Sequence, residues 1–217
     1  MNKQSKINLL PLLLCVILAM SMILTGCSEG TDRPVSSDTP TQSETSGSTK
    51  ADSTESVLTG TAAELGSLKS FSAATLDGSS FTQDDIFEKD MTIINFWALT
   101  CPPCIGEMPD LADFAKKLPD NVQMITMCLD ALDDEESTKS ILNEAGYEGV
   151  TLVSGDGDLL EVCYQLQYTP TTVLVDSEGN LVGDSIIGTC EDLSETYLTA
   201  VNTALKAAGK AEISLAS

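Results

Sequence analysis

Two cysteines, Cys101 and Cys104, are separated by two prolines and directly follow an apolar run. The run, Ile93 to Ala98, predicts a buried strand, and the residues that follow predict a helix. A thiol at a helix N-terminus is favoured as thiolate, because unpaired N–H groups and the helix dipole stabilise its charge. We therefore predict a redox pair in which Cys101 attacks a disulfide and Cys104 resolves the mixed disulfide.

The two prolines limit which N–H groups can reach the Cys101 sulfur. Pro102 and Pro103 carry no N–H, so the first available donors belong to Cys104 and Ile105. These donors predict a moderately lowered pKa for Cys101.

The same cysteine spacing also occurs in zinc sites and in purely structural disulfides. A zinc site needs two further ligands at suitable spacing, and the chain has no histidine. We therefore expect no metal and no cofactor. A structural disulfide remains an alternative interpretation of the pair.

The N-terminal residues indicate a targeting signal. Lys3 and Lys6 precede an apolar stretch from Leu9 to Leu24, and the sequence LTGC, which ends at Cys27, leads into polar residues. This pattern resembles the signal peptide and lipobox of bacterial lipoproteins. The resemblance implies a signal at 1–26, a lipid on Cys27 and a mature protein held outside the cytoplasmic membrane. An ordinary secretory signal and an uncleaved membrane helix are the alternatives.

The segment 27–60 is rich in Ser, Thr, Asp and Glu and poor in large apolar residues. Such a segment cannot bury enough surface to offset its ordering entropy, so we expect a flexible linker. The remainder, 61–217, has the length of one compact domain.

Hydrophobic periodicity and turn residues predict the elements that position the cysteines. We expect a hairpin or edge strand at 71–76. Pro109 should kink the helix at 102–118, because it lacks an N–H and its ring clashes with the preceding turn. Further strands are expected at 91–98, 122–129, 151–153, 171–175 and 181–187, and helices at 82–87, 102–118, 136–145, 158–166 and 191–208. This alternation implies an α/β domain with a mixed sheet covered on both faces.

Two segments carry a specific family resemblance. Residues 95–109 (NFWALTCPPCIGEMP), together with 168–172 (YTPTT) and the hairpin that follows, resemble the TlpA/ResA-type thiol-disulfide oxidoreductases of the thioredoxin superfamily. The match runs from about Gly66 to the C-terminus. It implies a thioredoxin-like fold, with a central mixed β-sheet flanked by helices and an N-terminal β-hairpin extension.

The resemblance also implies where a substrate binds. Pro170 would be a cis proline beside the disulfide, and Thr169 would offer backbone hydrogen bonds to a bound substrate. Trp97 is implied as a third substrate-binding residue. The alternative is a trans proline that opens an edge strand.

The chain departs from thioredoxin at two positions near the cysteines. Asn95 replaces a buried acid that can relay the proton of the resolving thiol, and an amide cannot titrate. Glu107, on the same helix as Cys104, is then the implied proton relay, or simply an acid favoured near a helix N-terminus. Thr100 replaces a second tryptophan of many relatives, which makes the surface beside Cys101 less apolar.

Three further cysteines have no assigned role. If Cys15 leaves with the signal and Cys27 carries lipid, five of seven cysteines remain, so at least one lacks a stable partner. Cys128, Cys163 and Cys190 fit small core residues. A second disulfide or an auxiliary exchange thiol is the alternative.

A formal charge of -22 excludes nucleic acid as a partner. The acidic runs predict solvated loops rather than metal sites. The resemblance implies disulfide-containing exported proteins or apocytochromes as substrates, a membrane thiol-electron donor and a monomer. The resemblance favours electron flow from the protein to its substrate, as in a reductase.

Two other functions are alternatives. A peroxiredoxin-like peroxidase needs a Thr three residues before its nucleophile and a nearby Arg, but Ala98 stands there and Arg33 is the only arginine. A noncatalytic binding lipoprotein that retains the disulfide is the third hypothesis.

Overall fold

We describe the protein from a computed structural model, which places residues 58–216. The expected signal peptide, the lipidation site Cys27 and most of the expected linker lie outside these residues. None of the helices within 58–216 is both long and apolar enough to cross a membrane.

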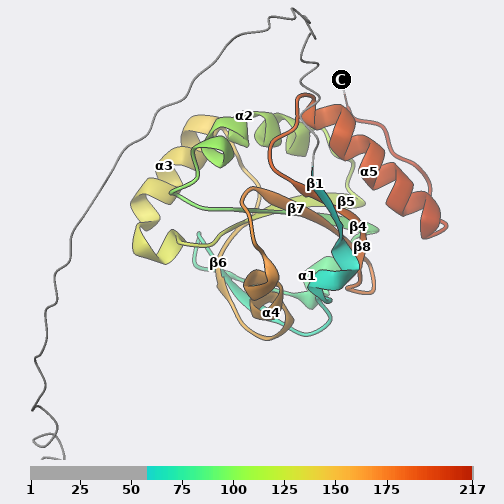
Figure 1. Cartoon of the computed structure of the whole chain (residues 1–217), viewed down its shortest axis with the longest axis horizontal. Coiled ribbons are helices and arrows are strands. Elements are labelled where there is room, and N and C mark those ends of the chain that lie inside the picture. The colour runs from blue at the N-terminus through green and yellow to red at the C-terminus, as the bar shows by residue number, and fades with distance from the viewer. Residues whose placement is uncertain (1–57, 217) are drawn as a thin grey trace, which may run out of the picture. The chain divides into compact units, whose positions relative to one another are not determined.

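The domain is built on one sheet of eight strands in the order β1-β8-β7-β4-β5-β6-β2-β3 (Figure 1). The strands are β1 (Leu58–Thr61), β2 (Ser72–Thr75), β3 (Ser80–Thr82), β4 (Met91–Trp97), β5 (Val122–Cys128), β6 (Thr151–Gly155), β7 (Thr171–Asp176) and β8 (Leu181–Ile187). Strands β4, β5 and β6 are parallel, and the other pairings are antiparallel. This confirms the expected mixed sheet.

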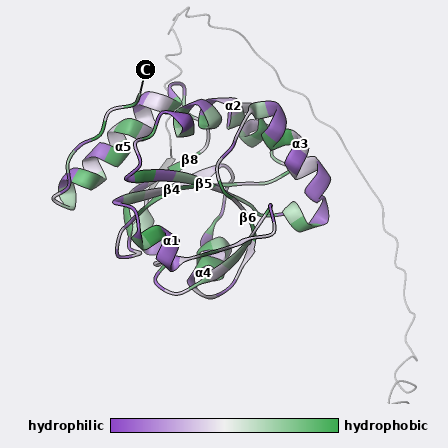
Figure 2. Cartoon of the chain, turned by 180° about the vertical axis from the view of Figure 1, so that it is seen from behind, coloured by the Kyte–Doolittle hydropathy of each residue, from purple (hydrophilic) through white to green (hydrophobic). Residues whose placement is uncertain are grey.

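Helices cover both faces of the sheet. They are α1 (Gln83–Phe87), α2 (Pro102–Lys116), α3 (Glu135–Ala145), α4 (Gly157–Gln165) and α5 (Leu193–Ala207), with 3-10 turns η1 (Ala62–Leu65) and η2 (Ala131–Asp133). Helices α2, α3 and α5 lie on one face, and α1 and α4 on the other (Figure 1). Hydrophobic and hydrophilic residues alternate along the helices, as expected where one side packs on a sheet (Figure 2).

The strand that leads to the cysteines, β4, is buried at every position. It pairs with β5 on one side and β7 on the other, and helices cover both its faces, which explains its continuous apolar sequence. Its side chains alternate between two cores. Ile93 and Trp97 pack towards α2 and α5, whereas Ile94 and Phe96 pack towards α1 and α4.

Helix α2 is confirmed as one helix that contains Pro109. The kink expected at Pro109 stays a prediction. The predicted buried face of α5 is confirmed by the burial of Leu193, Tyr197, Val201 and Leu205.

The N-terminal part of the domain shows one expected and one unexpected feature. The β-hairpin is confirmed, since β2 and β3 pair with each other and β2 joins the sheet at β6. Strand β1 lies partly within the expected linker and pairs with the edge of β8. Its sequence, LTGT, has a single large apolar residue, so backbone pairing rather than a side-chain pattern defines the strand.

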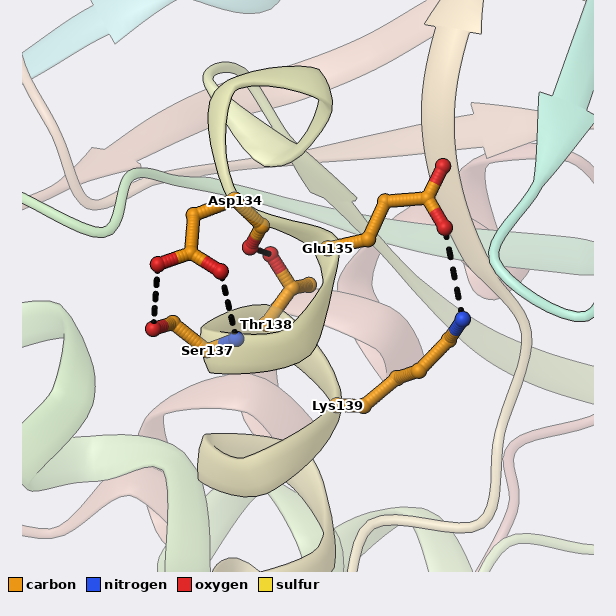
Figure 3. A network of polar contacts seen from close by, with 5 residues as sticks. All are labelled: Asp134, Glu135, Ser137, Thr138 and Lys139. Carbon is orange, nitrogen blue, oxygen red and sulfur yellow. Dashed lines mark hydrogen bonds and ion pairs between the residues drawn. The ribbon is translucent and has the colours of Figure 1, made fainter.

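The N-terminus of α3 corrects the expectation that its acidic residues form a solvated loop. The carboxylate of Asp134 accepts hydrogen bonds from the Ser137 N–H (2.9 Å) and hydroxyl (2.6 Å), and the Thr138 hydroxyl donates to the Asp134 carbonyl at 3.0 Å (Figure 3). Glu135, in the first turn, pairs with Lys139 at 3.3 Å. The acidic residues therefore cap a helix, where carboxylates satisfy free N–H groups.

Candidate active site

Cys101 and Cys104 form a disulfide at the N-terminus of α2, with Cα atoms 5.3 Å apart. Cys101 is the N-cap residue, and Pro102 and Pro103 begin the helix. The Cys104 N–H donates to the Cys101 sulfur at 3.3 Å, as expected. The second expected donor, the Ile105 N–H, instead binds the Cys101 carbonyl oxygen at 3.2 Å. One backbone N–H is therefore ready to stabilise a thiolate on Cys101.

The two cysteines differ in exposure. Cys101 keeps 8% of its surface exposed, whereas Cys104 has none. Only the Cys101 side of the disulfide is open to another molecule. This difference suits an attacking thiol at Cys101 and a resolving thiol at Cys104.

The loop before β7 lies against the disulfide. The Thr169–Pro170 peptide bond is cis, as the family resemblance implied. The Cys101 sulfur lies 3.5 Å from the Thr169 carbonyl oxygen. The Gly188 N–H donates to the Pro170 carbonyl oxygen at 2.9 Å, which ties this loop to the end of β8. The main chain of Thr169 is thus placed beside the exposed sulfur.

Glu107 on α2 and Asn95 on β4 form a buried pair. Glu107 lies one helical turn after Cys104 and is 7% exposed, and Asn95 is fully buried on β4. The Asn95 amide donates to Glu107 Oε1 at 3.2 Å. Burial raises the pKa of Glu107 to about 7; Asn95 opposes this shift and the charge of Asp110 adds to it. The site therefore holds a carboxyl that can take up and release a proton near neutral pH.

This pKa predicts how stability depends on pH. The folded pKa of Glu107 lies above its ordinary value of 4.5, so the folded state binds more protons between these values. The contribution of Glu107 to stability is then fully present below pH 4.5 and is lost as pH rises through about 7. We expect this group to cost about 3 kcal/mol over that window. Urea unfolding of the oxidised domain between pH 5 and 8 measures it.

A Glu107→Gln variant should remove most of that slope. Glu64→Gln, a substitution at an exposed acid, serves as the control and should keep it. An equal slope in wild type and Glu107→Gln would contradict the raised pKa.

Trp97 lies away from the surface where a substrate would dock. Its side chain is fully buried and packs in the core that also contains Cys101 and Cys104. This burial corrects the expectation of direct substrate contact. As the only tryptophan, the indole is instead suited to report on the redox state of the pair.

Sequence reasoning missed Asp130, which follows β5. Its Oδ1 accepts a hydrogen bond from the Leu99 N–H at 2.7 Å, in the loop between β4 and Cys101. An acid directly after the strand beside β4 was the available signal, because neighbouring parallel strands end at the same edge of a sheet. Asp130 therefore holds the loop that leads to the redox pair.

The three other described cysteines are unpaired. Cys128 is buried. Burial, and to a smaller extent the hydrogen bond to Asp130, raises the pKa of its thiol to about 12. Burial raises the pKa of Cys163 on α4 to about 11, and it also raises that of Cys190. Cys128 fits the expected core role, and no second disulfide is present within residues 58–216.

The fold and the Cys101–Cys104 pair define a thioredoxin-like thiol-disulfide oxidoreductase. Residues 62–205 match the model of the Redoxin family, and the chain belongs to that family.

Curated relatives agree with this class. The chain is 26% identical over 110 residues to the "Thiol:disulfide interchange protein DsbE homolog" of Paracoccus denitrificans, a match that covers 50% of this chain and 58% of that protein. It is 27% identical over 129 residues to the "Thiol-disulfide oxidoreductase ResA" of Bacillus anthracis, which covers 59% of this chain and 72% of that protein. The chain thus spans well under two thirds of the first relative's length.

Two solved structures show the same fold. The structure of MTB dsbF aligns with a TM-score of 0.51 at 26% identity, and covers 61% of this chain and 96% of that one. The thioredoxin domain of a thiol-disulfide oxidoreductase from Bacteroides vulgatus aligns with a TM-score of 0.51 at 25% identity, and covers 63% and 97%.

Proposed function

We propose that this chain is a membrane-anchored, extracytoplasmic oxidoreductase that reduces disulfides of exported proteins or apocytochromes. The observation that carries the proposal is the Cys101–Cys104 disulfide at the start of α2, with its only exposed sulfur 3.5 Å from the Thr169 carbonyl oxygen. The names of the DsbE and ResA relatives support the reaction class.

The first step is attack by reduced Cys101 on a substrate disulfide. A new S–S bond forms between Cys101 and one substrate sulfur, and the other substrate sulfur leaves as a thiolate. The Cys104 N–H, which contacts the Cys101 sulfur in the disulfide form, lies where it can stabilise the attacking thiolate. Thr169, beside that sulfur, offers main-chain groups to the bound substrate.

The second step releases the substrate. Cys104 gives its proton to the ionised Glu107 and attacks the Cys101 sulfur. The Cys101–Cys104 disulfide forms, and the substrate departs as its second thiolate. The substrate has then gained two electrons from the protein dithiol. A membrane thiol-electron donor reduces the protein disulfide again and completes the cycle.

The equilibrium reduction potential of the domain tests the direction of electron flow. The domain would be titrated against glutathione or dithiothreitol, with Trp97 fluorescence as the signal. We expect a value near or below about -220 mV, as for reductases of this fold, and a value near -120 mV would indicate an oxidant instead. Cys101→Ser should show no titration, and a titration that survives in this variant would overturn the redox assignment.

The anchor is a separate part of the proposal and has its own test. Cys27→Ser is expected to abolish incorporation of labelled fatty acid and to move most of the protein out of the membrane fraction, because no lipid can be attached. Cys15→Ser, a substitution within the expected signal peptide, should leave labelling intact. Equal labelling of the two variants would rule out Cys27 as the lipidation site.

A further inference from the structure

Four buried polar side chains form a continuous hydrogen-bonded row between the sheet and the helices α2 and α5. The Asn95 amide nitrogen donates to Glu107 Oε1 at 3.2 Å and to Thr172 Oγ1 at 3.0 Å. The Thr172 and Tyr197 hydroxyls are 2.7 Å apart. The row thus connects α2, β4, β7 and α5.

The sheet register brings the middle of this row together. Strands β4 and β7 are antiparallel, and Asn95 lies directly opposite Thr172. Residues that face each other across neighbouring strands point to the same side of the sheet. Both therefore point towards α2 and α5, the helices that carry Glu107 and Tyr197.

Hydrogen-bond chemistry assigns a direction to the row. The Asn95 amide nitrogen has two hydrogens, and one goes to each neighbour. A rotated amide would turn its oxygen towards the Glu107 carboxylate, and two acceptors would then repel each other. The Thr172 hydroxyl accepts one of these hydrogens and is itself held by the Tyr197 hydroxyl. Glu107 thereby sets which way the amide of Asn95 faces, and Thr172, held by Tyr197, anchors the amide in that orientation.

The orientation of the Asn95 amide matters because all four side chains are buried. Asn95 has no exposed surface, Thr172 and Tyr197 are each 1% exposed, and Glu107 is 7% exposed. Glu107 Oε2 has no hydrogen-bond partner among the described residues, so Asn95 is the only side chain there that binds this carboxyl. Hydrogen bonds to a charged group in such surroundings are strong, and their loss is costly.

We propose that Thr172 and Tyr197 are positioning residues for proton transfer from Cys104: they hold the Asn95 amide so that it stabilises the ionised form of Glu107. The inference rests on the proposed role of Glu107 as the proton acceptor. Neither hydroxyl touches the substrate or the reacting sulfur in this scheme; both act through Asn95.

The other groups that influence Glu107 do not favour its ionised form. Burial raises its pKa, and the negative charge of Asp110, on the same helix, raises it further. Tyr197 on α5 and Cys190 in the loop after β8 are also within its electrostatic reach. Burial is the main cause that raises the pKa of Tyr197, and the negative charge of Glu107 is the next. The same two causes raise the pKa of Cys190. These two groups are therefore neutral near pH 7, and the Asn95 hydrogen bond offsets part of the effect of burial on the carboxyl.

Direct titration of Glu107 tests this arrangement. The carboxyl would be followed by carbon-13 NMR in the oxidised protein, in wild type, Thr172→Val and Tyr197→Phe. We expect Thr172→Val to move the titration upward by roughly 0.5 to 1 pH unit, because the unanchored amide donates less well. Tyr197→Phe should give a smaller upward shift. Two positioning variants keep the test valid if one of them fails to fold.

The rate of the second chemical step gives an independent readout. Mixed-disulfide resolution by Cys104 would be followed in single turnovers with a peptide disulfide from pH 5 to 9. At pH 7 we expect Thr172→Val to slow resolution by roughly two- to fivefold, since less Glu107 is ionised. Thr172→Ser, which keeps the hydroxyl, should restore both the rate and the titration.

Thr92→Val is the matched control. It removes a buried hydroxyl that accepts a hydrogen bond from the Gln123 amide at 2.9 Å on the opposite face of β4 from Asn95, and it should leave the titration of Glu107 unchanged. An unchanged titration in both Thr172→Val and Tyr197→Phe would overturn the positioning role. If Glu107→Gln keeps the wild-type pH profile of resolution, the proton-relay part of the proposed function fails, and the catalytic role of the row fails with it.

Discussion

Replacing Cys104 with serine is expected to stop turnover and to leave the protein covalently attached to its substrate. Cys101 keeps its place at the start of α2 and its exposed sulfur, so the first exchange still occurs. No second thiol then attacks the mixed disulfide from the same helix. Turnover in a reductase assay should fall by roughly a thousand-fold or more, because the two sulfurs act as one unit.

Non-reducing electrophoresis after incubation with a disulfide substrate measures the trapped species. A band at the summed mass that disappears with dithiothreitol is the expected result. Cys101→Ser should give no such band. Cys163→Ser removes an unpaired cysteine on α4, on the opposite face of the sheet, and should retain full turnover. Trapping by Cys101→Ser but not by Cys104→Ser would reverse the roles of the two sulfurs.

Replacing Phe114 with alanine is expected to have the largest effect on stability. Phe114 on α2 has no exposed surface and packs edge-on against Tyr197 of α5, with ring centroids 5.6 Å apart. Its removal leaves a cavity between the helix that carries the redox pair and its neighbour. We expect the free energy of unfolding to fall by about 3 to 5 kcal/mol.

Urea unfolding of the oxidised domain measures this loss. Phe87→Ala is the matched control, because Phe87 at the end of α1 is 39% exposed. The control should cost less than about 1.5 kcal/mol, since it removes fewer buried contacts. Similar losses in the two variants would show that the contact between α2 and α5 contributes little.

The main elements of the fold were predictable because their sequences have a strong local pattern. The apolar run of β4 and the amphipathic face of α5 carry this signal, and both are confirmed. Strand β1 was not predicted, because it owes its place to pairing with β8 and has little pattern of its own. The cap formed by Asp134 was missed because the run of acidic residues before α3 offers several possible caps, and only the residue at which the helix begins selects one of them.

The sequence by itself determined the redox pair and the residues next to it along the chain. Residue types and spacing close along the chain were enough to predict the Cys101–Cys104 pair, because it depends on a helix N-terminus, which a short segment specifies. The cis Pro170 and the proton-relay role of Glu107 were implied by the family resemblance.

Only the tertiary structure decided what surrounds that pair. Asn95 meets Thr172 across 77 residues of sequence, and Leu99 meets Asp130 across 31. Such contacts depend on strand order and register, and a shift of one residue would turn Thr172 to the opposite face of the sheet. The burial of Trp97 likewise follows from the helices that cover β4. Packing between distant segments therefore decides how the redox pair is held and protonated.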